Sequence, residues 1–245
     1  MKGVILAGGT ATRLGALSVG TNKHLLPLGR EPMVCRSIRT LLEAGIEEAV
    51  VVVGVQHFGA FVRLLGDGGG LGMRRLQLAC QERPGGIAQA LLAAEAHAGG
   101  RVVVLLADNV WERSLRPWVE AFGRQESGAR ALLKATADIA TLRASGVPEL
   151  DATTRIGRVE EKPPVPASPY VVTGAYAFDE TVWSVLPGLA PSARGELEIT
   201  DVLNRYAERG LLEHDVIDGF WTDAGQSIEA YYRASDWVRR QEARS

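Results

Sequence analysis

Continuous apolar runs alternate along the first half of the chain with segments that are apolar on one helical face only. The runs GVILA (3–7), AVVVVG (49–54), LQLAC (76–80) and RVVVLLAD (101–108) contain few polar positions. A continuous apolar run is typical of a strand that is covered on both faces, whereas a half-exposed strand alternates apolar and polar residues. The four runs therefore predict buried strands of a parallel sheet.

Helical periodicity between these runs predicts the covering helices. After Pro32, the residues Val34, Ile38 and Leu41 fall on one helical face, and Gly45 ends that helix. Further helices are predicted at 58–66, 86–99 and 115–122, and a further strand at 129–136. This order of elements predicts an α/β fold with a doubly wound, mainly parallel, Rossmann-like mixed sheet.

The second half of the chain has shorter elements. The prolines of EEKPPVPASP (160–169) exclude regular structure there, with strands predicted near 158–159 and at 170–178. Helices are predicted at 196–209 and 228–241, with a short strand near 216. Because no repeat or flexible linker interrupts the chain, we expect a single domain over 1–245, with halves at about 1–110 and 111–245.

Composition and charge exclude several classes of protein. The 245 residues are 46% hydrophobic and 23% charged, and the formal net charge is -2. The sequence therefore has no excess of basic residues that would favour binding to nucleic acid or to an anionic membrane. The first apolar run is too short for a signal peptide, and no run is long enough to span a membrane. Cys35 and Cys80 lie far apart and form no CxxC motif, so we expect buried, reduced thiols in a cytoplasmic protein.

The first strand leads into a glycine loop, AGGTATRL (7–14), with Arg13 inside it and Lys23 following in NKHLLPLG. Glycines let a backbone approach phosphate closely, and two nearby cations favour phosphate or pyrophosphate as the ligand. The plainer alternative is a tight turn between strand and helix. The dinucleotide fingerprint GxGxxG is absent, and GALSVG is followed by Thr21 and Asn22 where a P-loop requires Lys-Ser/Thr. A dehydrogenase and a P-loop enzyme are therefore excluded.

Several ordered motifs resemble the sugar-1-phosphate nucleotidyltransferase family, and within it the glucose-1-phosphate thymidylyltransferase branch. They are AGGTATRL, TNKHLLPLG, QERPGGIAQAL, LADN, EEKP, VTGAY, RGELEIT and FWTDAG, and the match runs from residue 1 to about residue 235. Ala11 and Ala107 stand where the family pattern has glycine. The resemblance implies the nucleotide-diphospho-sugar transferase fold, with a nucleotide-binding first half and a sugar-binding second half. It also implies transfer from a nucleoside triphosphate to a sugar 1-phosphate, Mg²⁺ as cofactor, and a homo-oligomer.

The resemblance implies a role for each site residue. On the nucleotide side these are Leu6, Ala7, Gly8, Gly9, Thr10, Ala11, Thr12, Arg13, Gln81, Pro84, Gly86 and Asp108. Arg13 and Lys23 would hold the β- and γ-phosphates, and Asp108 and Asp223 would hold Mg²⁺. The Gln81 amide offers a donor and an acceptor, which match the N3–H and O4 edge of thymine or uracil.

On the sugar side, Lys162 would contact the sugar phosphate, and the implied catalytic residues are Arg13, Lys23, Asp108 and Lys162. The remaining sugar-side residues are Asn109, Gly146, Glu161, Val172, Arg194 and Glu196. The four histidines, His24, His57, His97 and His214, show no ligand spacing and are assigned no role.

The leading hypothesis is an enzyme that uses dTTP and glucose 1-phosphate. A UTP-dependent or other-sugar nucleotidyltransferase is the alternative within the class, and a non-catalytic nucleotide-sugar-binding regulator is the alternative outside it. A binder would not need the whole set of charged residues, which argues for the enzyme. Acyl transfer has no support, because Ser227 lies in GQSIE and no GxSxG motif is present.

Overall fold

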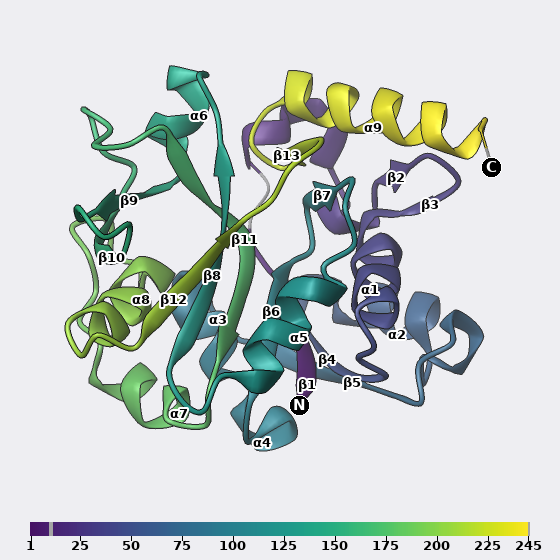
Figure 1. The fold of residues 1–245 in the computed structure, drawn as a ribbon. Helices are drawn as coiled ribbons and strands as arrows, with labels where there is room; N and C mark the ends of the chain where they lie inside the picture. The colour runs from purple at the N-terminus through teal and green to yellow at the C-terminus, as the bar shows by residue number, and fades with distance from the viewer. Residues whose placement is uncertain (10–11, 245) are drawn as a thin grey trace.

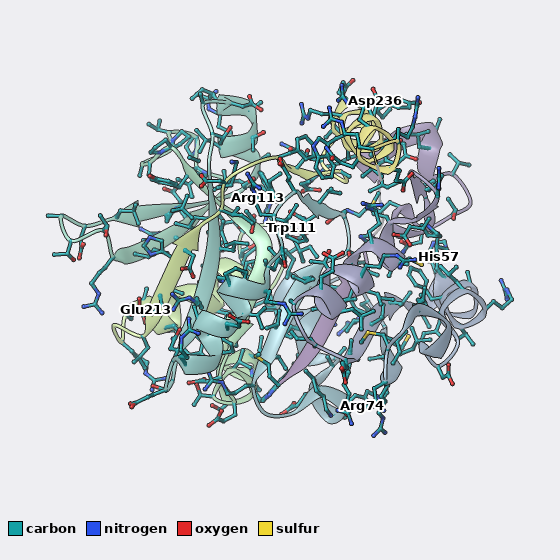
Figure 2. The ribbon with its side chains drawn as sticks, turned by 45° about the vertical axis from the view of Figure 1, so that its right-hand side comes forward. His57, Arg74, Trp111, Arg113, Glu213 and Asp236 are labelled. Atoms are coloured by element: carbon teal, nitrogen blue, oxygen red, sulfur yellow. The ribbon has the colours of Figure 1, made fainter. Side chains whose placement is uncertain are left out.

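The computed structural model describes residues 1–9 and 12–244, with the side chain of residue 12 left out, and is built on a central mixed sheet (Figure 1). From edge to edge the strands are β12 (Leu212–Val216), β8 (Ala129–Ala135), β11 (Tyr170–Phe178), β6 (Val102–Leu106), β1 (Lys2–Ala7), β4 (Glu48–Gly54) and β5 (Arg75–Gln81). Strand β11 runs antiparallel to both of its neighbours, and every other adjacent pair is parallel. In Figure 2, Glu213 on β12 and Arg74 just before β5 mark the two sides of the sheet. The predicted fold class is confirmed.

Each central strand is buried on both faces, which explains its continuous apolar run. Within β1, Val4 and Leu6 belong to one core cluster, whereas Ile5 and Ala7 belong to the other. The first cluster is covered by α3 (Ile87–Leu92), α4 (Glu95–Ala98), α7 (Val182–Val185) and α8 (Ile199–Ala207). The second is covered by α1 (Met33–Glu43), α2 (Phe58–Leu65) and α5 (Arg116–Arg124). Helices therefore cover both faces, as the doubly wound prediction requires.

The long helix α9 (Ile228–Glu242) lies across one end of the molecule and has its own small core (Figure 1). It packs with Leu14 and Leu28, and the Tyr231 hydroxyl donates to the Pro27 carbonyl at 2.7 Å. The short elements beside it are η1 (Thr12–Ser18), η2 (Lys23–Leu25), β2 (Pro27–Leu28) and β3 (Glu31–Pro32). This packing joins the C-terminal helix to the segment that follows the glycine loop.

Several element boundaries differ from the predictions. The helix predicted at 86–99 is two helices, α3 and α4, because the Ala94 amide donates to the Leu91 carbonyl in a tighter turn. The helix predicted from 196 begins at Ile199, and the strand predicted to reach 108 ends at Leu106. Cys80 is exposed rather than buried, because it lies on the edge strand β5.

Several short elements from residue 109 onward were not predicted from the sequence. They are β7 (Asn109–Trp111), α6 (Ile139–Ala144), β9 (Gly146–Leu150) and β13 (Trp221–Asp223), beside the predicted β10 (Ile156–Glu161). The remaining short turns are η3 (Val55–His57), η4 (Gly69–Leu71) and η5 (Leu186–Gly188). Over residues 1–9 and 12–244, no helix combines the length and the apolar character needed to cross a membrane.

Candidate active site

The site lies where the order of the parallel strands reverses. The chain passes from β1 to β4 and β5 on one side, and then returns to place β6 on the other side of β1. In open α/β sheets the crevice at the carboxyl ends of such strands binds ligands. A cavity of about 340 Å³ opens there. Its lining includes Leu6, Gly8, Gly9, Arg13, Lys23, His24, Gln81, Pro84, Gly86, Asp108, Lys162, Glu196, Asp223 and Gly225.

Asp108 is the centre of a buried cluster in this cavity. It follows β6 in a turn, and its Oδ2 accepts a hydrogen bond from Lys23 Nζ at 2.5 Å. His24 Nε2 lies 3.8 Å from the same oxygen, and Asp108 Oδ1 accepts from Asn109 Nδ2 at 3.1 Å. Asn22 supports the cluster, since its Oδ1 accepts from the His24 amide at 2.9 Å and its Nδ2 donates to the Ala7 carbonyl at 3.1 Å.

Burial and charge set the ionisation of these groups. Burial alone would raise the pKa of Asp108, but Lys23 and His24 hold that pKa well below its usual range. Burial opposes the ammonium of Lys23, and the charges of Asp108 and Asp223 more than offset it and raise the pKa of Lys23. Burial lowers the pKa of His24, so this imidazole is neutral at pH 7. Burial and the nearby Asp108 charge together raise the pKa of Asp223 to about 7.

Asp223 reaches the cluster through a short strand pair. Strand β13 runs antiparallel to β7 and places Asp223 opposite Asn109, while the Ala224 amide donates to the Asp108 carbonyl at 2.8 Å. At Gly225 a Cβ atom would overlap Asp108 Oδ2 and would lie 2.5 Å from Lys23 Nζ. The glycine of FWTDAG is thus required by the close approach of the backbone to this ion pair.

The structure brings the two predicted metal ligands into one cavity. Across the described part of the chain, no group of three or more His, Cys, Asp and Glu side chains is arranged to hold a metal ion. Two carboxylates with phosphate oxygens and water are nevertheless a common Mg²⁺ donor set, so the residues fit that ion once a phosphate is present.

Gln81, the last residue of β5, also lines the cavity. Its Nε2 donates to Gln89 Oε1 at 2.6 Å and lies 3.5 Å from the Gly86 carbonyl oxygen. Its Oε1 lies over Gly8, where a Cβ atom would overlap it. A second cavity of about 350 Å³, lined by Gln81, Gly9 and the loops after β1 and β4, adjoins the first.

Lys162, which follows β10, also lines the cavity. Its backbone is held at φ 50°, one of two positive φ values outside glycine among the described residues. Such strain persists only where the surroundings impose it, and it clusters at functional sites. Lys162 Nζ lies 3.3 Å from Glu161 Oε1, which also lies 3.3 Å from Arg194 Nη2. Arg194 in turn pairs with Glu198 at 2.7 Å and with Glu196 at 3.6 Å.

Several other predicted residues are not among those that line the cavity, namely Asn109, Gly146, Glu161, Val172 and Arg194. Asn109 is buried, and its Oδ1 accepts from Trp221 Nε1 at 2.9 Å and from the Gly174 amide at 3.2 Å. Its amide therefore links β7, β11 and β13, and its contact with sugar stays a prediction. Gly146 begins β9, and Val172 lies in β11 with 6% of its surface exposed. Thr10, Ala11 and the side chain of Thr12 lie outside the described residues.

Sequence reasoning missed three polar residues of the site, which are Asn22, His24 and Gln89. The histidine carries no ligand spacing, because its partner Asp108 is remote in the sequence. Asn22 and Gln89 lie inside the quoted motifs TNKHLLPLG and QERPGGIAQAL, and that membership was the available signal.

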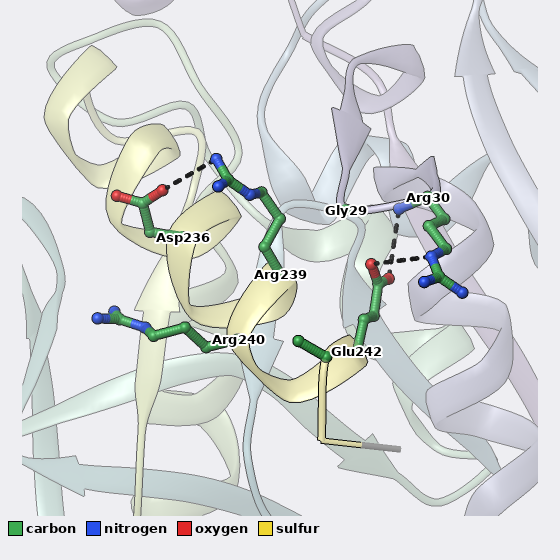
Figure 3. Close-up of a pocket in the computed structure, with 7 residues that line it drawn as sticks. Gly29, Arg30, Asp236, Arg239, Arg240 and Glu242 are labelled. Atoms are coloured by element: carbon green, nitrogen blue, oxygen red, sulfur yellow. Dashed lines mark hydrogen bonds and ion pairs between the residues drawn. The ribbon is translucent and has the colours of Figure 1, made fainter.

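A further cavity lies elsewhere, between the C-terminal end of α9 and the β2–β3 turn (Figure 3). It measures about 610 Å³ and is lined by Gly29, Arg30, Asp236, Arg239, Arg240, Glu242 and Ala243. Arg239 pairs with Asp236 at 3.6 Å, and Arg30 pairs with Glu242 at 4.0 Å. Since none of its lining residues belongs to the predicted set, this cavity is not the candidate site.

Comparison with known proteins identifies the family. The family model described as nucleotidyl transferase matches residues 2–241. This chain belongs to the nucleotidyl transferase family. As a nucleotidyl transferase it is 41% identical, over 98% of its length and 78% of the relative's, to the glucose-1-phosphate thymidylyltransferase of Actinoplanes sp.. It is 40% identical to the enzyme of that name from Mycolicibacterium smegmatis, over 100% of its own length and 84% of the relative's.

Solved structures of the nucleotidyl transferase family agree. A Bacillus anthracis protein assigned as a glucose-1-phosphate thymidylyltransferase, in complex with sucrose, has a TM-score of 0.90 and 42% identity, covering 98% of this chain and 95% of that one. A UDP-glucose pyrophosphorylase complexed with UDP-glucose has a TM-score of 0.84 at 21% identity, covering 98% of both chains, and shares the fold. The predictions of the family, of the fold and of an enzyme are confirmed.

Proposed function

We propose that this nucleotidyl transferase transfers a thymidylyl group from dTTP to glucose 1-phosphate, giving dTDP-glucose and pyrophosphate. One observation carries the proposal. The cavity at the carboxyl ends of β1 and β6 gathers charged and polar side chains from distant segments of the chain. They are the cations Arg13, Lys23 and Lys162, the carboxylates Asp108, Glu196 and Asp223, and the amide of Gln81. The names of the similar proteins support the choice of thymine and glucose.

The reaction is one displacement at phosphorus. An oxygen of the sugar phosphate attacks the α-phosphorus, the bond from the α-phosphorus to the bridging oxygen breaks, and pyrophosphate leaves with the bonding electrons. Such a transfer needs alignment and charge neutralisation rather than a protein nucleophile. Arg13 and Lys23 neutralise the departing pyrophosphate, and the glycine loop offers backbone amides to the same oxygens.

The sugar phosphate is brought to the α-phosphorus from the other side. Lys162 lines the cavity and carries the cation for that phosphate, while Glu161, its ion-pair partner, and Glu196, in the same lining, offer oxygens for sugar hydroxyls. Lys162 pairs only with Glu161 in the described part of the chain, at 3.3 Å, and both side chains are about one-quarter exposed. An ion pair of this exposure is weak, so a doubly charged phosphate can displace it.

Asp108 and Asp223 would hold Mg²⁺. The pKa of Asp223 is raised because the carboxyl is buried and lies near the charged Asp108. The two carboxylates together carry more negative charge than the single ammonium of Lys23 can balance. When bound, the ion supplies positive charge at the α-phosphate and orients it for in-line attack.

The remaining features are proposals that follow from the resemblance. We place nucleotide binding in about residues 1–110 and sugar binding in about residues 111–245 of a single domain. We also propose a cytoplasmic location and a homo-oligomer, with no nucleic acid and no membrane as partner.

A pyrophosphate-release assay over a matrix of nucleotides and sugar 1-phosphates tests the function. We expect the highest kcat/KM for dTTP with glucose 1-phosphate. Equal or higher kcat/KM for UTP, or for another sugar 1-phosphate, would replace the substrate assignment. Calorimetric binding of dTDP-glucose without turnover of any pair would instead favour the regulatory alternative.

A further inference from the structure

Gln81 and Gln89 form a pair of side-chain amides at the base-reading wall of the cavity. Gln81 is 5% exposed, and Gln89 lies half-buried on the first turn of α3. An amide side chain presents a donor on one side and an acceptor on the other, so its recognition of a base depends on which way it faces.

The surroundings of Gln81 determine its orientation. The Gly86 carbonyl oxygen can only accept, and it lies 3.5 Å from Gln81 Nε2. The Gln81 amide nitrogen therefore faces the Gly86 carbonyl. Because this nitrogen can only donate, the Gln89 atom that lies 2.6 Å from it is the acceptor Oε1. The Gln81 Oε1 atom is left over Gly8, at the glycine end of the cavity. Gln81 thus presents an acceptor to the cavity.

We propose that Gln89 is a positioning residue for base specificity, which holds the Gln81 amide so that Gln81 Oε1 can accept only from a base with an N3–H group. Thymine and uracil carry this donor, whereas the N3 of cytosine is an acceptor. Opposing cytosine N3 to Gln81 Oε1 would place two acceptors together, and a buried mismatch of this kind is costly. The inference rests on the proposed function, because it takes a pyrimidine nucleotide as the substrate of this site.

Two nearly isosteric variants separate this role from a structural one. Gln89→Glu keeps an acceptor for Gln81 Nε2, so it should preserve the wild-type ratio of kcat/KM for dTTP over dCTP within ~3-fold. Gln89→Met removes the acceptor and lets the Gln81 amide turn over, so the ratio should fall by about tenfold, the worth of one hydrogen bond. The ratio of dTTP to dUTP should stay unchanged in both variants, since both bases carry N3–H.

The outcomes are distinct. If Gln89→Met keeps the wild-type ratio of kcat/KM for dTTP over dCTP but loses activity with every nucleotide, Gln89 has only a structural role. That result would overturn the inference. A Gln89→Glu variant that loses discrimination as fully as Gln89→Met would also overturn it. A wild type that shows no preference for dTTP over dCTP would overturn the proposed base site itself, and with it the inference.

Discussion

Gly225→Ala is the smallest change that tests the geometry of the Lys23–Asp108 pair. The new Cβ would lie 2.5 Å from Lys23 Nζ and would overlap Asp108 Oδ2, so both groups must retreat by about 1 Å to reach an ordinary contact distance of ~3.5 Å. A displacement of about 1 Å at reacting groups costs roughly 10²-fold in rate, which equals about 2.7 kcal/mol of transition-state stabilisation. Overpacking costs folding less here, about 1 kcal/mol, because the methyl group meets a cavity wall.

The assay compares kcat/KM with the free energy of unfolding in urea for the same preparation. Gly123→Ala is the matched control, because Gly123 is an exposed helical glycine with no atom within 4 Å of an added Cβ. The control should keep full activity and gain up to about 1 kcal/mol of stability. Wild-type kcat/KM in folded Gly225→Ala would refute the role assigned to the ion pair.

The remaining predictions concern other groups. Lys162→Ala should raise KM for glucose 1-phosphate or lower kcat, while the dTTP affinity measured by calorimetry stays within ~2-fold of the wild-type value. A loss of dTTP affinity would instead assign Lys162 to the triphosphate. Asp223→Asn should lower kcat by ~10²-fold or more, and EDTA should abolish turnover until Mg²⁺ is restored, whereas full activity in EDTA would exclude the metal site. Burial opposes the ionisation of Asp179, but hydrogen bonds from Thr181 and the Gly128 amide hold the pKa of this carboxyl below its ordinary value. The ionised carboxylate therefore stabilises the fold above about pH 4, and this stabilisation is lost as the pH falls through the lowered pKa. Asp179→Asn should therefore have a free energy of unfolding in urea roughly 1–3 kcal/mol below that of the wild type at pH 7, and this difference should shrink below pH 4. A difference that does not change with pH would contradict the role of the Asp179 carboxylate.

The core of the fold could be predicted because its signal is local. Strands β1, β4 and β6 are buried on both faces, so their apolar runs are visible without knowledge of their partners. The short pair β7 and β13 gave no such signal, since each strand has three residues and each depends on the other from a distant part of the chain. The helix begins at Ile199 rather than at 196 for a local reason, because the Glu198 side chain accepts hydrogen bonds from Arg194 and Ser192 just before it.

The site was predictable as a set of residue types and only partly as a set of contacts. Motif membership indicated Asp108 and Lys23, but no local pattern shows that His24 lies against Asp108 or that Asn109 is committed to Trp221 and Gly174. These contacts arise only when η2 and the ends of β6, β11 and β13 come together. Sequence position therefore predicts which residues belong to the site better than it predicts what each one touches.

The most direct measurement is a crystal structure of the protein with dTDP-glucose and Mn²⁺ as an anomalous substitute for Mg²⁺. We expect thymine against Gln81 and the glucose beside Glu161 and Lys162. We also expect one anomalous peak within about 2.2 Å of carboxylate oxygens from both Asp108 and Asp223. A ligand seated in another cavity, such as the one between α9 and the β2–β3 turn, or a metal ion bound away from both carboxylates, would contradict this expectation.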